Sequence, residues 1–156
     1  SMKKLELDMP VPDIELPATD NQRFSLSELK GKHVVLYFYP KDSTPGCTIE
    51  GQNFRDYYDE FKKLKAEIYG VSKDNLKSHE NFKAEQCFPF ELISDRDGKL
   101  CELFDVIKEK SLYGKKYLGI ERSTFIIDKQ GLLRKEFRGV KVDGHVQQVL
   151  AALKSL

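Results

Sequence analysis

Short apolar runs alternate along this chain with longer stretches in which apolar residues recur at helical spacing. Residues 34–39 are apolar throughout and mostly β-branched or aromatic, which predicts a strand buried on both faces. Similar runs at residues 68–72, 90–93 and 123–127 predict further strands. The turn-prone sequence Asp128-Lys129-Gln130-Gly131 then predicts a hairpin into a strand at residues 132–137.

The stretches between these runs predict helices. We expect a long helix over residues 45–65, because one stripe of its surface is aromatic or aliphatic and carries Phe54, Tyr57, Tyr58, Phe61 and Leu64. Shorter helices are expected over residues 75–86 and 98–104. The chain ends in an amphipathic helix whose apolar face carries Val146, Val149, Leu150 and Leu153.

The N-terminal part predicts two short strands, at residues 14–16 and 22–24, around the turn-prone pair Asp20-Asn21. A helical turn at residues 25–29 follows and ends at Gly31. The whole order predicts an α/β fold with a central mixed β-sheet flanked by helices and an N-terminal β-hairpin, in one domain over residues 1–156. That order resembles the thioredoxin fold.

Composition narrows the classes of function. The chain has 26 basic and 25 acidic residues, so no excess of positive charge favours binding to nucleic acid or to an anionic membrane surface. Its longest apolar run, residues 34–39, is far shorter than the ~20 residues that cross a bilayer. No export signal is visible, and we expect a cytoplasmic protein. Ser1 is interpreted as an expression scar.

Cysteine and histidine usage predicts neither a disulfide framework nor a metal site. The three cysteines, Cys47, Cys87 and Cys101, are an odd number and do not lie at the spacing of zinc ligands. The histidines are equally scattered and are interpreted as structural or solvated: His33, His79 and His145. We expect no metal and no organic cofactor.

The segment around Cys47 carries the strongest chemical signal. Thr44 is a favoured N-cap residue, Pro45 suits the first helical position, and Gly46 lets a ligand approach the backbone. Cys47 then falls in the first turn of a helix, where amides lack intrahelical partners and the helix dipole is positive. Both effects favour a thiolate over a thiol, as in reactive cysteines.

A second candidate, Arg122, opens the predicted strand at residues 123–127. In a sheet of this kind it is expected beside the end of the first core strand, near Cys47. When a thiolate attacks an O–O bond, a fixed cation there can stabilise the charge that develops on the departing oxygen, together with the Thr44 hydroxyl and nearby amides.

These residues resemble the peroxiredoxin signature. The pattern Pro40-x-x-x-Thr44-x-x-Cys47 and a later Arg before a strand are typical of that family. The longer stretches Pro45-Gly46-Cys47-Thr48-x-Glu50 and Arg122-Ser123-Thr124-Phe125-Ile126-Ile127-Asp128 are similar to its bacterioferritin comigratory protein branch, also called the Q type. The likeness extends from about Pro12 to the C-terminal helix.

The resemblance implies a thiol peroxidase that reduces hydrogen peroxide and organic hydroperoxides, with a role in antioxidant defence. Cys47 would be the peroxidatic cysteine and pass from thiolate to sulfenic acid. Thr44 would orient the peroxide, Arg122 would stabilise charge and Pro40 would shield the site. A thioredoxin-type or other thiol donor would then recycle the enzyme.

The chain departs from part of the branch at the resolving cysteine. Gln52 stands five residues after Cys47, where many members carry that cysteine. Cys87 is the favoured replacement, because some members resolve through a cysteine on the helix that it ends, whereas Cys101 has apolar neighbours and is expected in the core. A one-cysteine cycle stays open. The decamer-building features of sensitive peroxiredoxins are missing, so we expect a monomer, with a weak dimer as the alternative.

Three other functions fit the pattern less well. A thioredoxin-type oxidoreductase needs Cys-x-x-Cys, but the flanking positions are Thr44 and Glu50. A cysteine hydrolase needs a histidine base, and no histidine has local support. A binding module with the same fold would not need a reactive thiol. Glu50 is interpreted as a helix-start acid outside the site, while the resemblance leaves open that it also orients Arg122.

Overall fold

A seven-stranded mixed sheet forms the centre of the molecule in the computed structural model, which describes residues 4–156. Its strand order is β2-β1-β5-β4-β3-β8-β9. Ser1, interpreted as an expression scar, lies outside the described residues. The strands are β1 (Glu15–Ala18), β2 (Gln22–Ser25), β3 (His33–Phe38), β4 (Ala66–Ser72), β5 (Glu91–Ser94), β8 (Ser123–Ile127) and β9 (Leu133–Arg138).

The direction of the strands confirms the mixed sheet and the N-terminal hairpin. Strands β3, β4 and β5 run parallel, whereas β8 and β9 join antiparallel on one side. The β1–β2 hairpin joins antiparallel to β5 on the other side. The helices are α1 (Pro45–Asp56), α2 (Tyr58–Lys63), α3 (Leu76–Gln86), α4 (Lys99–Leu103) and α5 (His145–Lys154), with a 3-10 turn at Leu26–Leu29.

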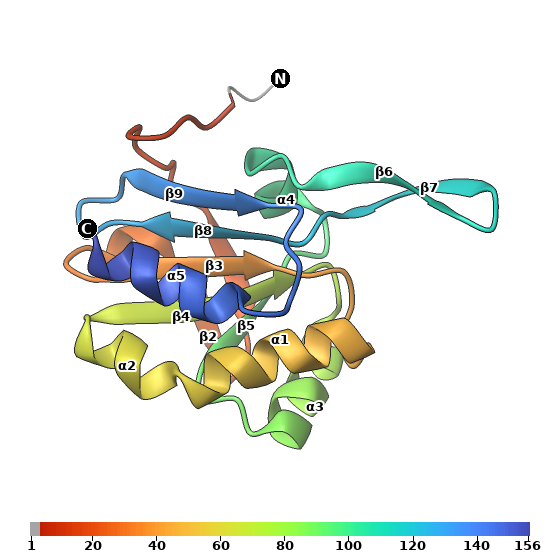
Figure 1. Ribbon diagram of the computed structural model, residues 1–156, viewed down its shortest axis with the longest axis horizontal. Coiled ribbons are helices and arrows are strands. Elements are labelled where there is room, and N and C mark those ends of the chain that lie inside the picture. The colour runs from red at the N-terminus through yellow and green to blue at the C-terminus, as the bar shows by residue number, and fades with distance from the viewer. Residues whose placement is uncertain (1–3) are drawn as a thin grey trace.

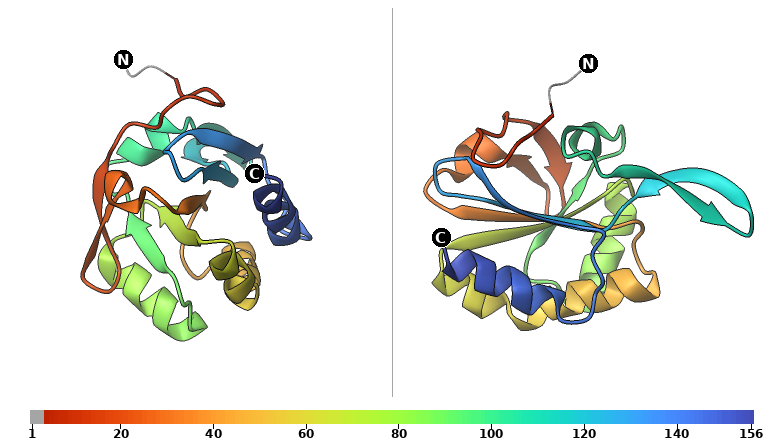
Figure 2. Two further views of the ribbon diagram at one scale, coloured as in Figure 1. Left: turned by 90° about the vertical axis from the view of Figure 1, so that its left-hand side faces the viewer. Right: turned by 45° about the horizontal axis from the view of Figure 1, so that its top comes forward.

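Two apolar layers cover the two faces of this sheet. Helices α1, α2, α3 and α5 pack on one face, and α4 packs on the other with the N-terminal segment (Figures 1 and 2). Alternate residues of β3 enter the two layers, since Val35 and Tyr37 face the first, while Leu36 and Phe38 face the second. This explains why β3 is apolar at nearly every position.

The register between β3 and β8 sets the position of the candidate site. Phe38, the last residue of β3, lies opposite Ser123, the first residue of β8. Arg122 therefore lies just beyond the end of β3, where the chain leaves the sheet toward α1. This confirms the expected place of Arg122 beside the end of the first core strand.

The single helix expected over residues 45–65 is wrong in one respect. The structure has two helices, because the chain leaves helical hydrogen bonding at Tyr57 (φ −100°, ψ 6°). The apolar stripe nevertheless continues across the break, with Phe54 and Phe61 both fully buried. Periodicity reports which side of a segment is buried and does not detect such an interruption.

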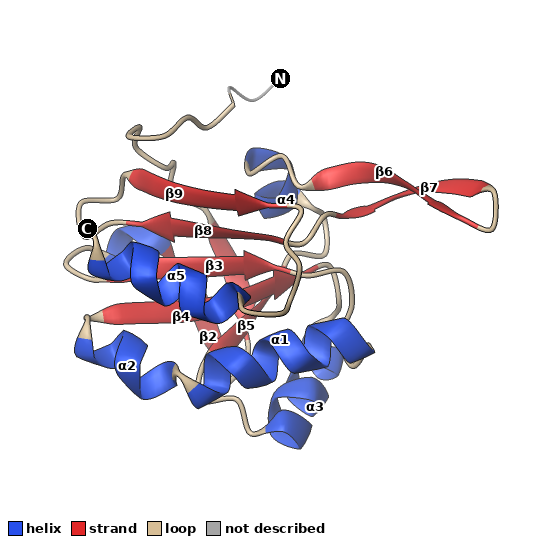
Figure 3. Cartoon of the chain, viewed as in Figure 1, coloured by secondary structure: helices blue, strands red, loops and turns tan. Residues whose placement is uncertain are grey.

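A protruding hairpin was not predicted from the sequence. Strands β6 (Ile107–Leu112) and β7 (Lys115–Ile120) form a separate two-stranded sheet that extends from the body (Figure 3). Tyr113 and Gly114 join them with positive φ angles of 51° and 79°, as a type I′ turn requires. The hairpin stands largely outside the core, so its residues show no alternation of apolar and polar positions. The Tyr-Gly turn was the available signal.

None of the helices between residues 4 and 156 combines the length and the apolar composition needed to cross a membrane.

Candidate active site

Cys47 lies in the first turn of α1, at the end of the sheet where β3 ends and the β6–β7 hairpin projects (Figure 1). Pro45 begins the helix, which makes Cys47 its third residue, as the sequence predicted. Its side chain is almost completely buried, with 2% of the residue exposed. The thiol therefore meets the positive end of the helix dipole in a site with little water.

Thr44 is the N-cap residue, but its hydroxyl does not cap the helix. The Thr44 Oγ1 atom instead donates a hydrogen bond to the Lys41 carbonyl at 2.8 Å. Ser43 between them has a φ of 63°, so the loop turns sharply here through a left-handed residue. Since the Thr44 hydrogen is already donated, the lone pairs of its oxygen are available to accept a hydrogen bond. Pro40 lies exposed at the start of this loop.

Arg122 reaches the thiol with both terminal nitrogens. Its Nη1 and Nη2 atoms each donate to Cys47 Sγ at 3.6 Å. A Cβ atom at Gly46 would lie 3.1 Å from Arg122 Nη2, so glycine leaves room for the guanidinium beside the helix start. The structure thus brings together two residues that are 75 positions apart.

Glu50 belongs to this cluster and is more than a helix-start acid, because it binds Arg122. Its Oε1 atom accepts a hydrogen bond from Arg122 Nη1 at 2.7 Å, and its side chain is fully buried. Burial raises the pKa of Glu50 to about 7, and the Arg122 charge only partly offsets this. Burial lowers the pKa of Arg122, but the Glu50 and Cys47 charges outweigh it and the net shift is upward. The i to i+3 spacing from Cys47 was the available signal.

Aromatic packing and one histidine enclose the cluster. The Tyr37 ring stacks on Phe54 at 4.5 Å, and its hydroxyl has no hydrogen-bond partner among the described residues. Burial raises the pKa of Tyr37, and the Glu50 and Cys47 charges raise it further. His145 is bonded to Thr124 Oγ1 at 2.7 Å, and burial, with Arg122, lowers its pKa to about 4. A ring with so low a pKa is a poor base, which disfavours the cysteine hydrolase.

The other two cysteines differ in exposure. Cys87 is exposed and follows the last turn of α3 in a left-handed conformation, with a φ of 56°. Cys101 is fully buried in α4, as expected, and burial together with the Asp95 carboxylate raises its pKa well above the ordinary range. All three thiols are free in this structure.

Helices α1 and α3 contact each other next to Cys87. Gln52, the position of the missing cysteine, donates to the Gln86 side chain at 2.8 Å, and Arg55 donates to the Gln86 carbonyl at 2.8 Å. The Phe88 ring packs directly against the Cα of Gly51, where a Cβ atom would lie 2.3 Å from the ring. The end of α3 therefore adjoins the helix that carries Cys47.

One group of side chains has the composition of a metal site. Ligand atoms of Asp42, Asp74 and His79 lie within 4.8 Å of one another. The protein itself already uses these atoms in hydrogen bonds, including His79 Nε2 with the Ile93 carbonyl at 2.9 Å. The arrangement suits a buried polar network better than an open coordination site.

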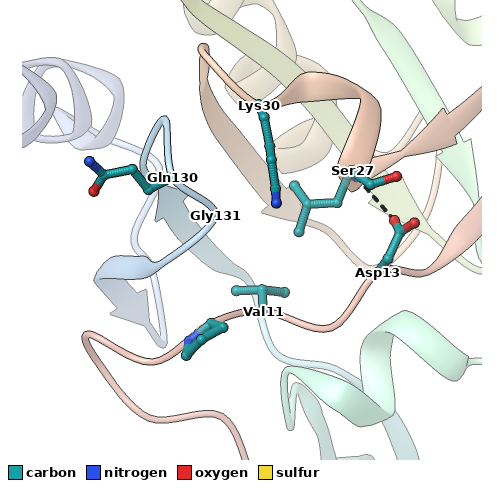
Figure 4. Close-up of a pocket in the computed structure, with 8 residues that line it drawn as sticks. Val11, Asp13, Ser27, Lys30, Gln130 and Gly131 are labelled. Carbon is teal, nitrogen blue, oxygen red and sulfur yellow. Dashed lines mark hydrogen bonds between the residues drawn. The ribbon is translucent and has the colours of Figure 1, made fainter.

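A pocket lies at the opposite end of the sheet. Figure 4 shows it between the N-terminal segment near Val11 and Asp13, the turn at Ser27 and Lys30, and the β8–β9 turn. Since β3 and β8 are antiparallel, the β8–β9 turn adjoins the start of β3 and Arg122 adjoins its end. None of the residues that line the pocket belongs to the Cys47 cluster.

The chain is similar along most of its length to known proteins. The AhpC/TSA family profile matches residues 7–136. Peroxiredoxin Bcp of Bacillus subtilis (strain 168) is 50% identical over 152 residues, which cover 97% of each protein. Peroxiredoxin Bcp of Xanthomonas campestris is 52% identical over 151 residues, which cover 97% of this chain and 94% of the relative.

Solved structures agree in fold. Xanthomonas campestris peroxiredoxin Q has a TM-score of 0.89 at 51% identity and covers 97% of this chain and 96% of its own. A structure described with the alkyl peroxide reduction activity of Xanthomonas campestris bacterioferritin comigratory protein has the same TM-score at 50% identity, with the same coverage. Enterococcus faecalis AhpC, at 22% identity and a TM-score of 0.79, shares the fold, with coverages of 96% and 93%.

Proposed function

The chain belongs to the AhpC/TSA family and is a cysteine-dependent peroxidase of the peroxiredoxin Bcp branch, and from that premise we propose that Cys47 is its peroxidatic cysteine. One observation carries the assignment: both terminal nitrogens of Arg122 lie 3.6 Å from Cys47 Sγ, in the first turn of α1. A fixed cation and a helix start acting on one buried sulfur stabilise a thiolate nucleophile.

The first step transfers one oxygen atom from the hydroperoxide to sulfur. The Cys47 thiolate attacks the terminal oxygen, an S–O bond forms and the O–O bond breaks. The departing oxygen leaves as hydroxide or alkoxide, takes up a proton and becomes water or alcohol. Cys47 is oxidised to sulfenic acid as the peroxide is reduced.

Thr44 and Arg122 are assigned to orientation and charge in this step. The Thr44 oxygen, whose hydrogen is donated to Lys41, accepts the hydrogen bond of the peroxide O–H and so fixes the direction of attack. Arg122 stabilises the negative charge that develops on the departing oxygen. Pro40 is assigned to shielding the site from solvent at the start of the same loop. Substrates are hydrogen peroxide and organic hydroperoxides, as the alkyl peroxide activity of the Xanthomonas campestris relative suggests.

The second step is assigned to Cys87. Its thiol attacks the Cys47 sulfenic acid, an S–S bond forms, and water leaves with the sulfenic oxygen. A thioredoxin-like dithiol then reduces the disulfide and is itself oxidised. Exposure of Cys87 supports this role, because the reductant must reach one of the two sulfur atoms.

Formation of this disulfide requires local rearrangement. Cys47 begins α1 and is buried, whereas Cys87 follows the last turn of α3 and is exposed. A disulfide needs Cα atoms within ~7 Å, and a buried thiol can meet an exposed one only if one or both helix ends loosen. The left-handed Cys87 backbone favours loosening at α3, because a non-glycine residue is strained there.

We assign the enzyme to the cytoplasm as one domain over residues 1–156, monomeric or weakly dimeric.

Disulfide mapping after one equivalent of hydrogen peroxide tests these assignments. The parent should form a Cys47–Cys87 disulfide, whereas a Cys87→Ser variant should hold a sulfenic acid at Cys47 that a sulfenic-acid probe captures. Cys101→Ser is the matched control and should behave as the parent.

Two outcomes would contradict separate parts of the assignment. Rapid peroxide consumption by Cys47→Ser would show that another group is the nucleophile. A Cys87→Ser variant that cycles with thioredoxin at the parental rate would leave a one-cysteine cycle, in which an external thiol reduces the sulfenic acid.

A further inference from the structure

A buried polar network joins helix α3 to the loop that precedes Cys47. His79 lies on α3 and is completely buried, and Asp42 lies in the loop between β3 and α1 with 6% of the residue exposed. The His79 Nδ1 atom is 2.7 Å from Asp42 Oδ2, and its Nε2 atom is 2.9 Å from the Ile93 carbonyl oxygen. Both ring nitrogens therefore face oxygen acceptors.

The partners of this network define where protons must lie. A backbone carbonyl can only accept, so His79 Nε2 carries a hydrogen. The Asp42 carboxylate also accepts from the Tyr39 hydroxyl at 2.6 Å and from the Ser78 hydroxyl at 2.8 Å, which is the pattern of an ionised acid. Nδ1 must then carry a second hydrogen to bond Asp42 Oδ2. The geometry describes an imidazolium paired with a carboxylate.

A second carboxylate faces the same pair. The Asp74 carboxylate lies within 4.8 Å of the facing atoms of Asp42 and His79, so two acids surround one imidazole. Asp74 is itself held, because its Oδ2 atom accepts from the Asp42 amide at 2.9 Å and from the Ser72 hydroxyl at 2.6 Å. A buried charge without a partner would be costly, whereas each charge here has charged and neutral partners.

The network acts on the residue that is assigned to orient the peroxide. Asp42 follows Lys41 directly, and the Lys41 carbonyl accepts the Thr44 hydroxyl at 2.8 Å. His79 holds the Asp42 side chain from α3, while Asp74 holds the Asp42 amide from the β4–α3 loop. The direction of the Thr44 oxygen therefore depends on a loop that His79 fixes.

We propose that His79 is a positioning residue of the peroxidase: as an imidazolium bound to Asp42, it fixes the Lys41 carbonyl and so sets the direction of the Thr44 hydroxyl. This inference rests on the proposed roles of Cys47 and Thr44. It assigns to α3 a function in the first step of the cycle, in addition to carrying Cys87 for the second.

The protonation state is tested on the parent protein by long-range 1H–15N NMR with 15N-labelled histidine, using His79→Asn to assign the signals. Both ring nitrogens of His79, which face oxygen acceptors, should carry hydrogen in the folded protein. A signal from an unprotonated Nδ1 at pH 7 would overturn the proposal, because Asp42 would then be the donor or the contact would be lost.

The positioning role is tested by two substitutions that differ in one donor. Asn carries its amide nitrogen on Cγ, as histidine carries Nδ1, and can still donate to Asp42, whereas Leu cannot. His79→Leu should lower kcat/KM for hydrogen peroxide about 10-fold, and His79→Asn should stay within about 3-fold of the parent. The exposed Lys77 of the same helix gives the control, Lys77→Gln, which should match the parent.

A double-substitution cycle with Thr44→Val separates positioning from general destabilisation. If His79 acts through Thr44, His79→Leu should have little further effect on kcat/KM when Thr44→Val is already present. Equal losses in both backgrounds, or equal losses in His79→Leu and His79→Asn at equal folded fraction, would overturn the proposal. If His79→Leu does not fold, the NMR measurement decides. Cys47→Ser in the same assay reports separately whether the underlying assignment of the nucleophile fails.

Discussion

Cys47 and Cys101 occupy the same helical position in two parts of the molecule, and their surroundings differ in charge. Each is the third residue of its helix, in α1 and α4, and each is buried, with 2% and 0% of the residue exposed. The Cys47 thiol receives hydrogen bonds from Arg122 at 3.6 Å. Cys101 instead lies beside Asp95, whose carboxylate accepts a hydrogen bond from the Cys101 backbone amide at 2.8 Å.

The difference shows that a helix N-terminus does not by itself make a cysteine reactive. At α4, Asp95 takes up the free amides and adds a negative charge, so burial and that charge raise the pKa of Cys101. At α1, Gly46 leaves room for a cation, and the buried acid Glu50 is bound to that cation. The sign of the neighbouring charge separates the two thiols.

The largest difference in peroxide consumption should appear when Cys47 and Cys101 are each replaced by serine. We expect Cys47→Ser to lower the rate of peroxide consumption by at least about 10³-fold, because the nucleophile is lost. Cys101→Ser should keep the parental rate. Both rates are measured at equal folded fraction, as judged by circular dichroism. Comparable losses in the two variants would remove the distinction between the sites.

Removing the cation should make the Cys47 site resemble the Cys101 site. We expect Arg122→Met to slow peroxide reduction about 10²–10³-fold, since charge on the departing oxygen loses its stabiliser. Arg122→Lys should recover part of this loss, because it keeps the charge but not the two-pronged geometry. Stopped-flow peroxide reduction gives the rates. Arg134→Gln, at the far end of the sheet, is the control, and a parental rate in Arg122→Met would show that the cation does not act on the reaction.

The carboxylate beside the cation should give the stability of the protein a pH dependence. The pKa of Glu50 is raised from 4.5 to about 7, so the folded protein holds a proton that the unfolded chain releases between these values. The contribution of Glu50 to the free energy of unfolding is therefore highest below about pH 4.5 and falls as the pH rises to about 7, by up to about 3 kcal/mol.

Denaturant unfolding of the parent and of Glu50→Gln across this pH range measures that contribution. The parent should lose stability relative to the variant as the pH rises, because Gln cannot ionise. Glu60→Gln, an exposed substitution on α2, should follow the parent. Parallel stability curves for the parent and Glu50→Gln would contradict the raised pKa of Glu50.

The smallest effect is expected from replacing Cys101. Cys101→Ala should leave peroxide turnover within about 2-fold of the parent and lower the free energy of unfolding by about 1 kcal/mol, since it removes a buried sulfur atom and leaves a small cavity. Alkylation of the native protein should modify the exposed Cys87 and spare Cys101. Alkylation of Cys101 in the folded protein would show that its burial is not maintained.

Local sequence predicted most of the fold and one end of the site. The apolar run in β3 and the spacing of Phe54 and Phe61 identified the strand and the helix face, because burial imposes these periods. The Thr-Pro-Gly-Cys segment placed Cys47 in the first helical turn, because residues next to one another decide where a helix begins. The β6–β7 hairpin escaped prediction, since a strand pair outside the core carries no such period.

What the sequence by itself determined is therefore the chain order of the strands of the central sheet, the thiol and its position at a helix start. Tertiary structure decided which charge faces that thiol, since Arg122 arrives from 75 residues away through the β3–β8 register. It also decided that Glu50 is buried against that cation and that His79 meets Asp42 across 37 residues. The physical reason is the range of the forces: capping and periodicity act between neighbours in the chain, whereas charge pairing and burial depend on which segments the sheet brings together.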